Sequence, residues 1–363
     1  MCRWFAYLSP SEECLLEDVL ITPDHSLAKQ VHDHYLPKLF SHLPGQATTK
    51  QEINLRNRLF NIDGFGVAWY TPVRCSFAQR TTTTSDPSST NTSTNNLRPA
   101  LFKTSSPPMN DANFHSICAN TSTTAVFAHI RAATGSTSVA SINNHPFVFG
   151  RHTLMHNGII ASFSDIRRPL LDLLSKAAFE GVHGSTDSEH LAALYMTYLT
   201  GGGGGGIESW ERQYSVQQMR DALLAAYRKV VQLQQAALGV DNVQANSLNV
   251  CVTDGAQLVA FRLRNHAVEQ PPSLYYSTMA GVTLNRKYPD LPAGGANPDA
   301  VKSSAEHGRH VVVASEPTTY RVEDWILIEK NHALLVDAEG NCVVEDIEPP
   351  SELLALAATG NHF

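Results

Sequence analysis

The chain has 363 residues, with 27 Lys and Arg against 34 Asp and Glu, and a formal net charge of −7. It contains no Lys/Arg run, so it lacks the basic patch that phosphate contacts need, which excludes the nucleic-acid-binding classes. No apolar stretch reaches the roughly 18–20 residues of a membrane helix. The first residues, MCRWFAYLS, lack the features of a signal peptide, and the six cysteines form no CxxC pair. We therefore expect a cytoplasmic protein without a disulfide framework or a zinc ribbon.

Four short apolar runs in the first half of the chain are bounded by turn residues and predict strands. They are Arg3–Leu8, Gly66–Tyr70, Val126–Arg131 and Thr153–His156. Apolar residues then recur every three or four positions in three segments, which predicts helices. These are Ser164–Phe179, Asp187–Leu199 and Ser215–Ala237. Strands resume in two predicted hairpins, around Asp254–Gly255 and around Glu339–Asn341.

This order of strands, then helices, then strands indicates an α+β layered domain rather than a doubly wound one. The sequence contains neither GxGxxG nor a GxxxxGKS/T loop, so no nucleotide cofactor is expected.

Three low-complexity insertions interrupt the patterned sequence, at about 75–120, 200–207 and 286–309. The first holds RTTTTSDPSSTNTSTNN at 80–96 and is broken only by LRPALFK. The second is a run of six glycines, and the third is rich in Pro, Gly and Ala. Such segments lack the apolar area that would offset the entropy of ordering them. Without them, we expect one domain over 2–363 rather than the two or three that the length suggests.

Cys2 is the first residue with a chemical signature. Removal of Met1 would leave a cysteine with a free α-amine, whose pKa of roughly 7.7–8.0 lies close to that of a thiol near about 8.5. Such an amine can take the thiol proton and later return it to a leaving group. The simpler interpretation is an incidental cysteine near an N-terminus, and position alone does not exclude it.

The segments AVFAHIRAATGS, INNHPF, RHTLMHNGII and GSTDSEH contain five polar residues at the ends of predicted elements. They are Arg131, His145, Asn157, Gly158 and Asp187. Acyl transfer on an amino-acid amide needs a guanidinium for the α-carboxylate and a carboxylate for the α-ammonium. An Asn amide and a backbone N–H can stabilise the oxyanion.

Each of these residues also has a simpler interpretation when taken alone. Arg131 could form a surface ion pair, Asn157–Gly158 could be a turn, and Asp187 could complement a helix dipole. His145, His152 and His156 could be drawn as a metal site. However, His152 and His156 would lie roughly 13 Å apart in a strand, and the glutamate of HExxH is absent. No metal is therefore expected there.

Six segments together resemble the class II glutamine amidotransferases, which are N-terminal-nucleophile hydrolases. The segments are MCRWFAYL, NIDGFGVAWY, AHIRAATGS, NNHPF, LMHNGII and STDSEH. The chain also resembles the glutamine amidotransferase-like subunit of the fungal glutathione-degradation complex and the γ-glutamyl amidase of bacterial ergothioneine synthesis. The resemblance runs from Cys2 to SEPTTYRVEDW at 315–325 and skips the insertions. It implies a four-layer αββα sandwich.

The resemblance also implies roles for individual residues. Cys2 would be the nucleophile, with its own amine as base, and Asn157 and Gly158 would form the oxyanion hole. Arg131 would bind the glutamyl α-carboxylate and Asp187 the α-ammonium. Thr134 and His145 would be loop residues near the pocket.

The sequence departs from this family in one loop, which reads RWATHG in the synthetic amidotransferases. Ala132 stands at the tryptophan and Gly135 at the histidine. These smaller residues suggest a more open pocket that suits a γ-glutamyl peptide. We therefore expect hydrolysis of the γ-glutamyl bond of glutathione, without a cofactor, together with a metallopeptidase-like partner subunit. Two alternatives are a glutaminase subunit that supplies ammonia to a separate synthase, and a scaffold subunit without activity.

Overall fold

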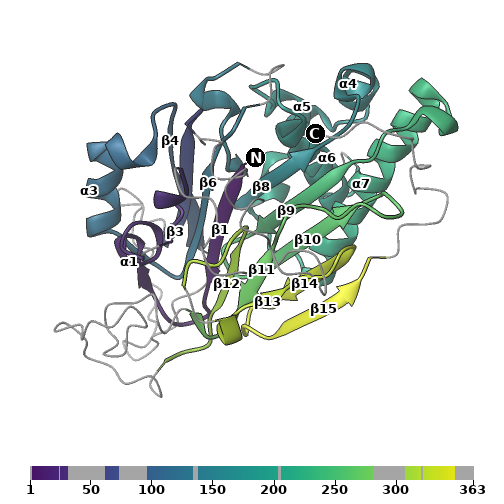
Figure 1. Cartoon of the computed structure of the whole chain (residues 1–363). Helices are drawn as coiled ribbons and strands as arrows, with labels where there is room; N and C mark the ends of the chain where they lie inside the picture. Colours follow the sequence, from purple (N-terminus) through teal and green to yellow (C-terminus); the bar gives the residue numbers. More distant parts are fainter. Residues whose placement is uncertain are drawn as a thin grey trace, which may run out of the picture.

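Two antiparallel β-sheets pack face to face, and helices cover the outer face of each (Figure 1). This is a computed structural model, and it describes residues 2–23, 25–31, 62–72, 96–133, 138–202, 206–280, 307–319 and 322–347. The seven-stranded sheet has the order β13 (Ile326–Leu327), β11 (Tyr275–Ser277), β12 (Val311–Ala314), β1 (Arg3–Leu8), β6 (Ala125–Ile130), β3 (Phe65–Pro72), β4 (Leu97–Thr104). The six-stranded sheet has the order β15 (Cys342–Asp346), β14 (His332–Val336), β10 (Leu258–Arg264), β9 (Ser247–Thr253), β8 (His152–Ile159), β7 (Phe147–Phe149). A small third sheet pairs β2 (Cys14–Leu15) with β5 (Ser122–Thr123).

Six α-helices flank the sheets. They are α1 (Leu16–Leu20), α3 (Ala112–Asn120), α4 (Phe163–Leu171), α5 (Lys176–Glu180), α6 (Asp187–Leu199) and α7 (Val216–Leu238) within the described residues. Short 3₁₀ turns are η1 (Lys29–Val31), η3 (Pro108–Asn110), η4 (Ser141–Asn143), η5 (Ile207–Glu211), η6 (Val240–Asn242) and η8 (Val322–Asp324). The element order and the layers confirm the expected α+β fold with the αββα arrangement.

Strand β1 shows why the sandwich has two buried interfaces. Successive side chains of a strand point to opposite faces. Trp4 and Ala6 belong to the core between the sheets, whereas Phe5 and Tyr7 belong to the core under α1 and α3. All six residues of β1 are buried, as expected for a strand covered on both sides.

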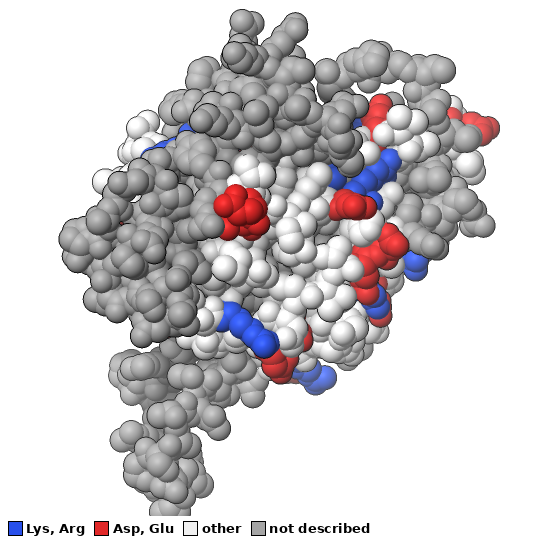
Figure 2. Space-filling view, turned by 60° about the horizontal axis from the view of Figure 1, so that its bottom comes forward, with Lys and Arg blue, Asp and Glu red and all other residues white. Residues whose placement is uncertain are grey.

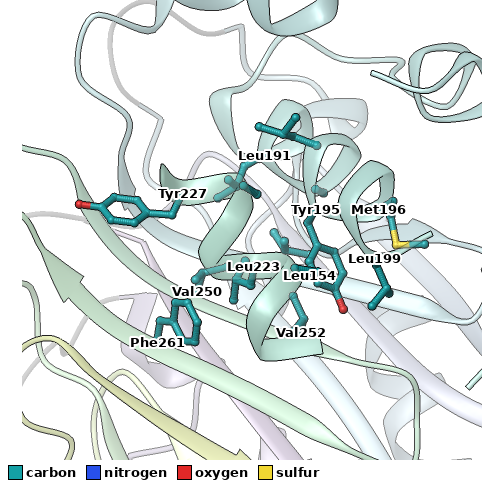
Figure 3. Close-up of a cluster of buried hydrophobic side chains, with 14 of the residues drawn as sticks. Leu154, Leu191, Tyr195, Met196, Leu199, Leu223, Tyr227, Val250, Val252 and Phe261 are labelled. Atoms are coloured by element: carbon teal, nitrogen blue, oxygen red, sulfur yellow. The ribbon is translucent and has the colours of Figure 1, made fainter. Parts of the chain in front are cut away.

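The third core lies between the six-stranded sheet and helices α4 to α7. Figure 3 shows Leu191, Tyr195 and Leu223 of α6 and α7 packed against β8, β9 and β10. The predicted helix over Asp187–Leu199 is confirmed, and the one over Ser215–Ala237 is α7, one residue further along the chain. Both begin with a side-chain cap. The Thr186 hydroxyl accepts from the Glu189 N–H, and the Ser215 hydroxyl accepts from the Gln218 N–H.

Two expectations about element boundaries are wrong. The single helix over Ser164–Phe179 is two helices, because Ser175 caps the N–H of Ala178 and starts a new one. The insertion at about 75–120 is too long, because α3 lies within it, whereas β4 coincides with the LRPALFK segment that was expected to break it. Helix α3 starts at an Asp111 cap and buries Phe114 and Cys118 at a spacing of four residues.

The other predicted insertions concern residues that the structure describes only in part. Residues 73–95, 203–205 and 281–306 lie outside the described residues. Among the described helices, none has the length and apolarity needed to cross a membrane. Acidic and basic side chains lie next to one another on the face shown in Figure 2, and they are not gathered into a patch of one sign.

Candidate active site

Cys2 lies at the start of β1, in the central part of the seven-stranded sheet. The register pairs Arg3 with Ile130, so one step further along the two strands Cys2 lies beside Arg131. The Ala132 N–H donates to Cys2 Sγ at 3.4 Å, and Sγ lies 3.6 Å from the Ala132 carbonyl oxygen. The alternation of β1 directs Cys2 to the same side as Trp4, between the two sheets. The Cys2 thiol is therefore held at the edge of the inter-sheet space.

The surroundings of the Cys2 thiol act on its pKa in two directions. Burial raises the pKa of Cys2, because a thiolate loses hydration there. The hydrogen bond from Ala132 and the positive charges of Arg131 and Arg3 lower it. A thiol in this position is protonated at rest and needs a base nearby to become a nucleophile.

Arg131 directly follows β6 and is only 4% exposed, so the surface ion pair considered from the sequence is wrong. Its guanidinium donates to the Ser138 carbonyl at 3.0 Å and to Asn144 Oδ1 at 3.4 Å. Burial lowers the pKa of Arg131, and the charges of Cys2, Asp63 and Asp187 raise it. The Arg131 cation is therefore within electrostatic reach of the Cys2 thiol and of the Asp63 and Asp187 carboxylates.

Asn157 and Gly158 lie inside β8 (His152–Ile159), so the interpretation of His-Asn-Gly as a turn is wrong. The Asn157 side chain is buried, and its Nδ2 has no hydrogen-bond partner among the described residues. A Cβ atom at Gly158 would lie 1.8 Å from the Ser247 carbonyl oxygen of β9, so this position requires glycine. A buried donor without a partner is a feature that a ligand oxyanion would satisfy.

Asp187 is the first residue of α6 and also reaches the end of β8. Its Oδ2 accepts from the Ile160 N–H at 2.9 Å, and its Oδ1 accepts from the Ser188 N–H at 2.8 Å. The Ser188 hydroxyl also bonds Asp187 Oδ1 and lies 2.9 Å from His156 Nδ1. The helix-dipole interpretation and the binding interpretation are therefore both compatible with this geometry, because Asp187 fixes α6 against the strand that carries Asn157.

Of the two predicted loop residues near the pocket, Thr134 and His145, the structure describes only His145. Thr134 lies outside the described residues. His145 is buried, with its ring centroid 4.0 Å from that of His129 and 4.7 Å from that of Phe147. Burial lowers the pKa of His145 well below its usual value, so the ring is neutral. It follows Asn144, which contacts the Arg131 guanidinium.

Sequence reasoning missed two residues that hold the site. Asp63 Oδ2 accepts from the Ala133 N–H at 2.8 Å, which fixes the chain just after Arg131. His129 Nε2 lies 3.1 Å from the His156 carbonyl oxygen and so joins the two sheets. Asp63 stands in the NIDGFG segment next to Gly64, whose φ of +133° marks a special backbone position. That Asp-Gly pair was the available signal.

A cavity of about 390 Å³ lies next to η4, and its lining includes Lys103, Phe147, Glu189 and Trp210. Cys2, Arg131, Asn157 and Asp187 are not among its lining residues. The Lys103 ammonium lies over the Phe147 ring at 4.7 Å, and burial lowers the pKa of Lys103 to about 8. This cavity is separate from the four candidate catalytic and binding groups.

Comparison with solved structures defines the class of the fold. A glutamine aminotransferase class-II domain protein from Silicibacter pomeroyi matches with a TM-score of 0.52 and 20% identity, over 96% of this chain and 100% of that chain. Glutamine phosphoribosylpyrophosphate amidotransferase from B. subtilis matches with a TM-score of 0.50 and 12% identity, over 96% of this chain and 49% of that chain. The two-sheet sandwich of this chain is therefore the fold of these class II glutamine amidotransferase structures.

The sequence comparison narrows this class. The chain is 27% identical over 337 residues to probable glutamine amidotransferase DUG3 of Saccharomyces cerevisiae, which covers 93% of this chain and 82% of that protein. No family profile matches the chain. The chain is thus similar in sequence to a probable glutamine amidotransferase and similar in fold to class II glutamine amidotransferase structures.

Proposed function

We propose that this chain hydrolyses γ-glutamyl amide bonds with Cys2 as the nucleophile. The observation that carries the proposal is the position of Cys2 beside Arg131, whose cation is stabilised by the charge of Asp187. A γ-glutamyl group carries an α-carboxylate and an α-ammonium at one end and the scissile amide at the other. The α-carboxylate is matched by the Arg131 guanidinium, the α-ammonium by the Asp187 carboxylate, and the scissile amide by the Cys2 thiol.

The first chemical step is attack on the γ-carbonyl. Removal of Met1 gives Cys2 a free α-amine, and this amine takes the thiol proton. The thiolate forms a C–S bond, and the carbonyl oxygen becomes an oxyanion. The Asn157 amide and the Gly158 N–H donate to this oxyanion. The tetrahedral intermediate then collapses, the C–N bond breaks, and the leaving amine receives the proton from the Cys2 ammonium.

The second step releases the acyl group. The γ-glutamyl thioester on Cys2 is attacked by water, and the neutral α-amine takes one of its protons. The C–S bond breaks, the thiolate is reprotonated, and glutamate leaves. Cys2 is restored, so the cycle needs no cofactor.

We propose glutathione as the substrate and a metallopeptidase-like protein as a partner subunit in the cytoplasm. The resemblance to the amidotransferase-like subunit of the fungal glutathione-degradation complex supports this, as does the similarity to DUG3. Ala132 supports it as well, because its backbone contacts the Cys2 thiol and it has a small side chain at the position where synthetic amidotransferases have tryptophan. A smaller side chain at this position leaves room in the pocket for a leaving group larger than ammonia.

A side-by-side assay tests the proposal. Glutamate release is measured from glutathione and from glutamine, with the chain alone and with candidate partners, for the native chain and Cys2→Ala. We expect glutamate and cysteinylglycine from glutathione, and no product with Cys2→Ala. Efficient turnover of glutamine while glutathione is ignored would instead identify a glutaminase that supplies ammonia to a synthase. Undiminished activity of Cys2→Ala in the assembled complex would assign the chain a scaffold role.

A further inference from the structure

A second cluster of chemically capable side chains lies at the opposite end of β1 from Cys2. Glu12 follows β1, and His307 and His310 precede β12, the strand that pairs with β1. One ligand atom from each of the three side chains lies within 4.8 Å of the others. In the part of the chain that the structure describes, this is the one group of three such residues at this spacing.

The cluster is buried, which separates it from ordinary surface acids. Glu12 and His310 are 7% and 4% exposed, and the His307 side chain is 5% exposed. Removing a carboxylate from water is unfavourable unless a cation or several donors replace its hydration. Glu12 Oε2 accepts from the Gly308 N–H at 2.9 Å and lies 3.0 Å from His307 Nδ1.

The backbone around these side chains is held in place on both sides. Ser9 Oγ accepts from the Glu12 N–H at 2.8 Å and donates to the Arg309 carbonyl at 2.7 Å. The Tyr7 hydroxyl donates to the Glu12 carbonyl at 3.1 Å. The loop after β1 and the segment that enters β12 are thereby fixed to each other.

The His310 ring has the orientation of a metal-binding imidazole. Its Nδ1 lies 3.2 Å from the Gly308 carbonyl oxygen, which can only accept, so Nδ1 carries the proton. Nε2 is then the nitrogen with the lone pair. A backbone carbonyl that fixes the tautomer in this way is the usual second partner of a metal-bound histidine. The ring also stacks on Tyr7 with an interplanar angle of 13°.

We propose that Glu12, His307 and His310 bind one Zn²⁺ ion, with water as the fourth ligand. Two imidazoles and one carboxylate are a donor set that Zn²⁺ takes in proteins. Ligand distances of about 2.0–2.2 Å place donor atoms roughly 3.4 Å apart, so donor atoms within 4.8 Å of one another need to approach by at most about 1.4 Å. This site is independent of the proposed γ-glutamyl hydrolysis.

The place of the site in the fold indicates a structural role. At roughly 3.3 Å per residue, the six residues from Cys2 to Leu8 separate the site from the nucleophile by about 20 Å. A metal there joins the end of β1 to the start of β12, whose register pairs Leu8 with Val311. It would stabilise the strand that carries Cys2 without touching the reaction.

Zinc binding tests this proposal on the full chain, after any affinity tag has been removed and metal has been stripped with a chelator. Zn²⁺ is titrated calorimetrically, and the metal content is measured after desalting. A Cys2→Ser background removes the nucleophile as a competing ligand. We expect one Zn²⁺ per chain, a Kd at least tenfold higher in Glu12→Gln and His307→Asn, and a higher unfolding temperature with zinc than without.

His332→Asn is the matched control, because His332 also pairs with a carboxylate, Asp346 at 2.9 Å, but lies outside the cluster. Its zinc affinity should equal that of the parent. Co²⁺ in place of Zn²⁺ should give visible bands without a thiolate charge-transfer band. A zinc content below a tenth per chain, unchanged affinity in both cluster variants, or a thiolate band would overturn the proposal and leave a hydrogen-bonded cluster only.

Discussion

Asn157→Ala separates catalysis from stability at the proposed oxyanion hole. If Asn157 Nδ2 donates to the oxyanion, its loss should lower kcat/KM by about 10²–10³-fold, or about 2.7–4 kcal/mol of transition-state stabilisation. Stability should change little. A buried donor without a partner costs about 1–3 kcal/mol, and its removal offsets the small cavity that alanine leaves. We expect the unfolding midpoint to stay within about 2–4 °C of the native value.

The assay is glutamate release from glutathione and glutamine, together with thermal unfolding of the same preparations. Asn249→Ala is the matched control, because Asn249 is the register partner of Asn157 in β9. Its Nδ2 donates to the carbonyls of Pro272 and Ser273, so its loss should cost stability rather than turnover. Full activity of Asn157→Ala, or an activity loss that only follows a lower unfolding midpoint, would refute the oxyanion-hole assignment.

Three further predictions concern single residues. Intact-mass measurement should show that the active chain begins at Cys2. Its kcat/KM should rise with pH up to about 8, because the α-amine then loses its proton and can act as the base. Activity of a chain that retains Met1 would contradict both expectations. Gly158→Ala should unfold at a clearly lower temperature than the native chain, since its Cβ meets the Ser247 carbonyl at 1.8 Å, and an unchanged melting curve would disprove the contact. Burial lowers the pKa of His129 to about 3, so the unfolded chain binds more protons between about pH 6.5 and pH 3. Stability should therefore decrease as the pH is lowered through that window, by about 1.4 kcal/mol per pH unit for this residue. Denaturant titrations should show a weaker dependence of stability on pH for His129→Gln than for the native chain.

The layers of the fold could be predicted from the sequence because periodicity reports burial directly. The strand over Arg3–Leu8 and the helix over Asp187–Leu199 have the bounds that their apolar patterns predict. The break between α4 and α5 was missed, because Leu170, Leu171, Leu173 and Leu174 continue an apolar pattern through a turn that only the Ser175 cap reveals. Local capping chemistry overrides a period that is otherwise unbroken.

The sequence predicts the candidate catalytic and binding residues, but it does not predict the residues that hold them in position. Cys2, Arg131 and Asp187 carry recognisable chemistry, and the register brings the first two together. Asp63 acts through a single backbone N–H, that of Ala133, and His129 acts through a carbonyl of the facing sheet. Such contacts depend on which strands become neighbours, which no local pattern specifies.

The strand order also determines when the sheet around Cys2 can be completed. Strand β1 is made before β12, with which it pairs on one side and which follows some three hundred residues later. Until Val311–Ala314 exists, β1 has a neighbour only on its β6 side, and the Cys2 thiol at its start lies in an incomplete sheet. A nascent chain can lose its initiator methionine early, but the pairing of β1 with β12 has a high contact order and can form only after β12 has been made. A translation product that ends before Val311 therefore lacks the strand that completes the sheet beside Cys2.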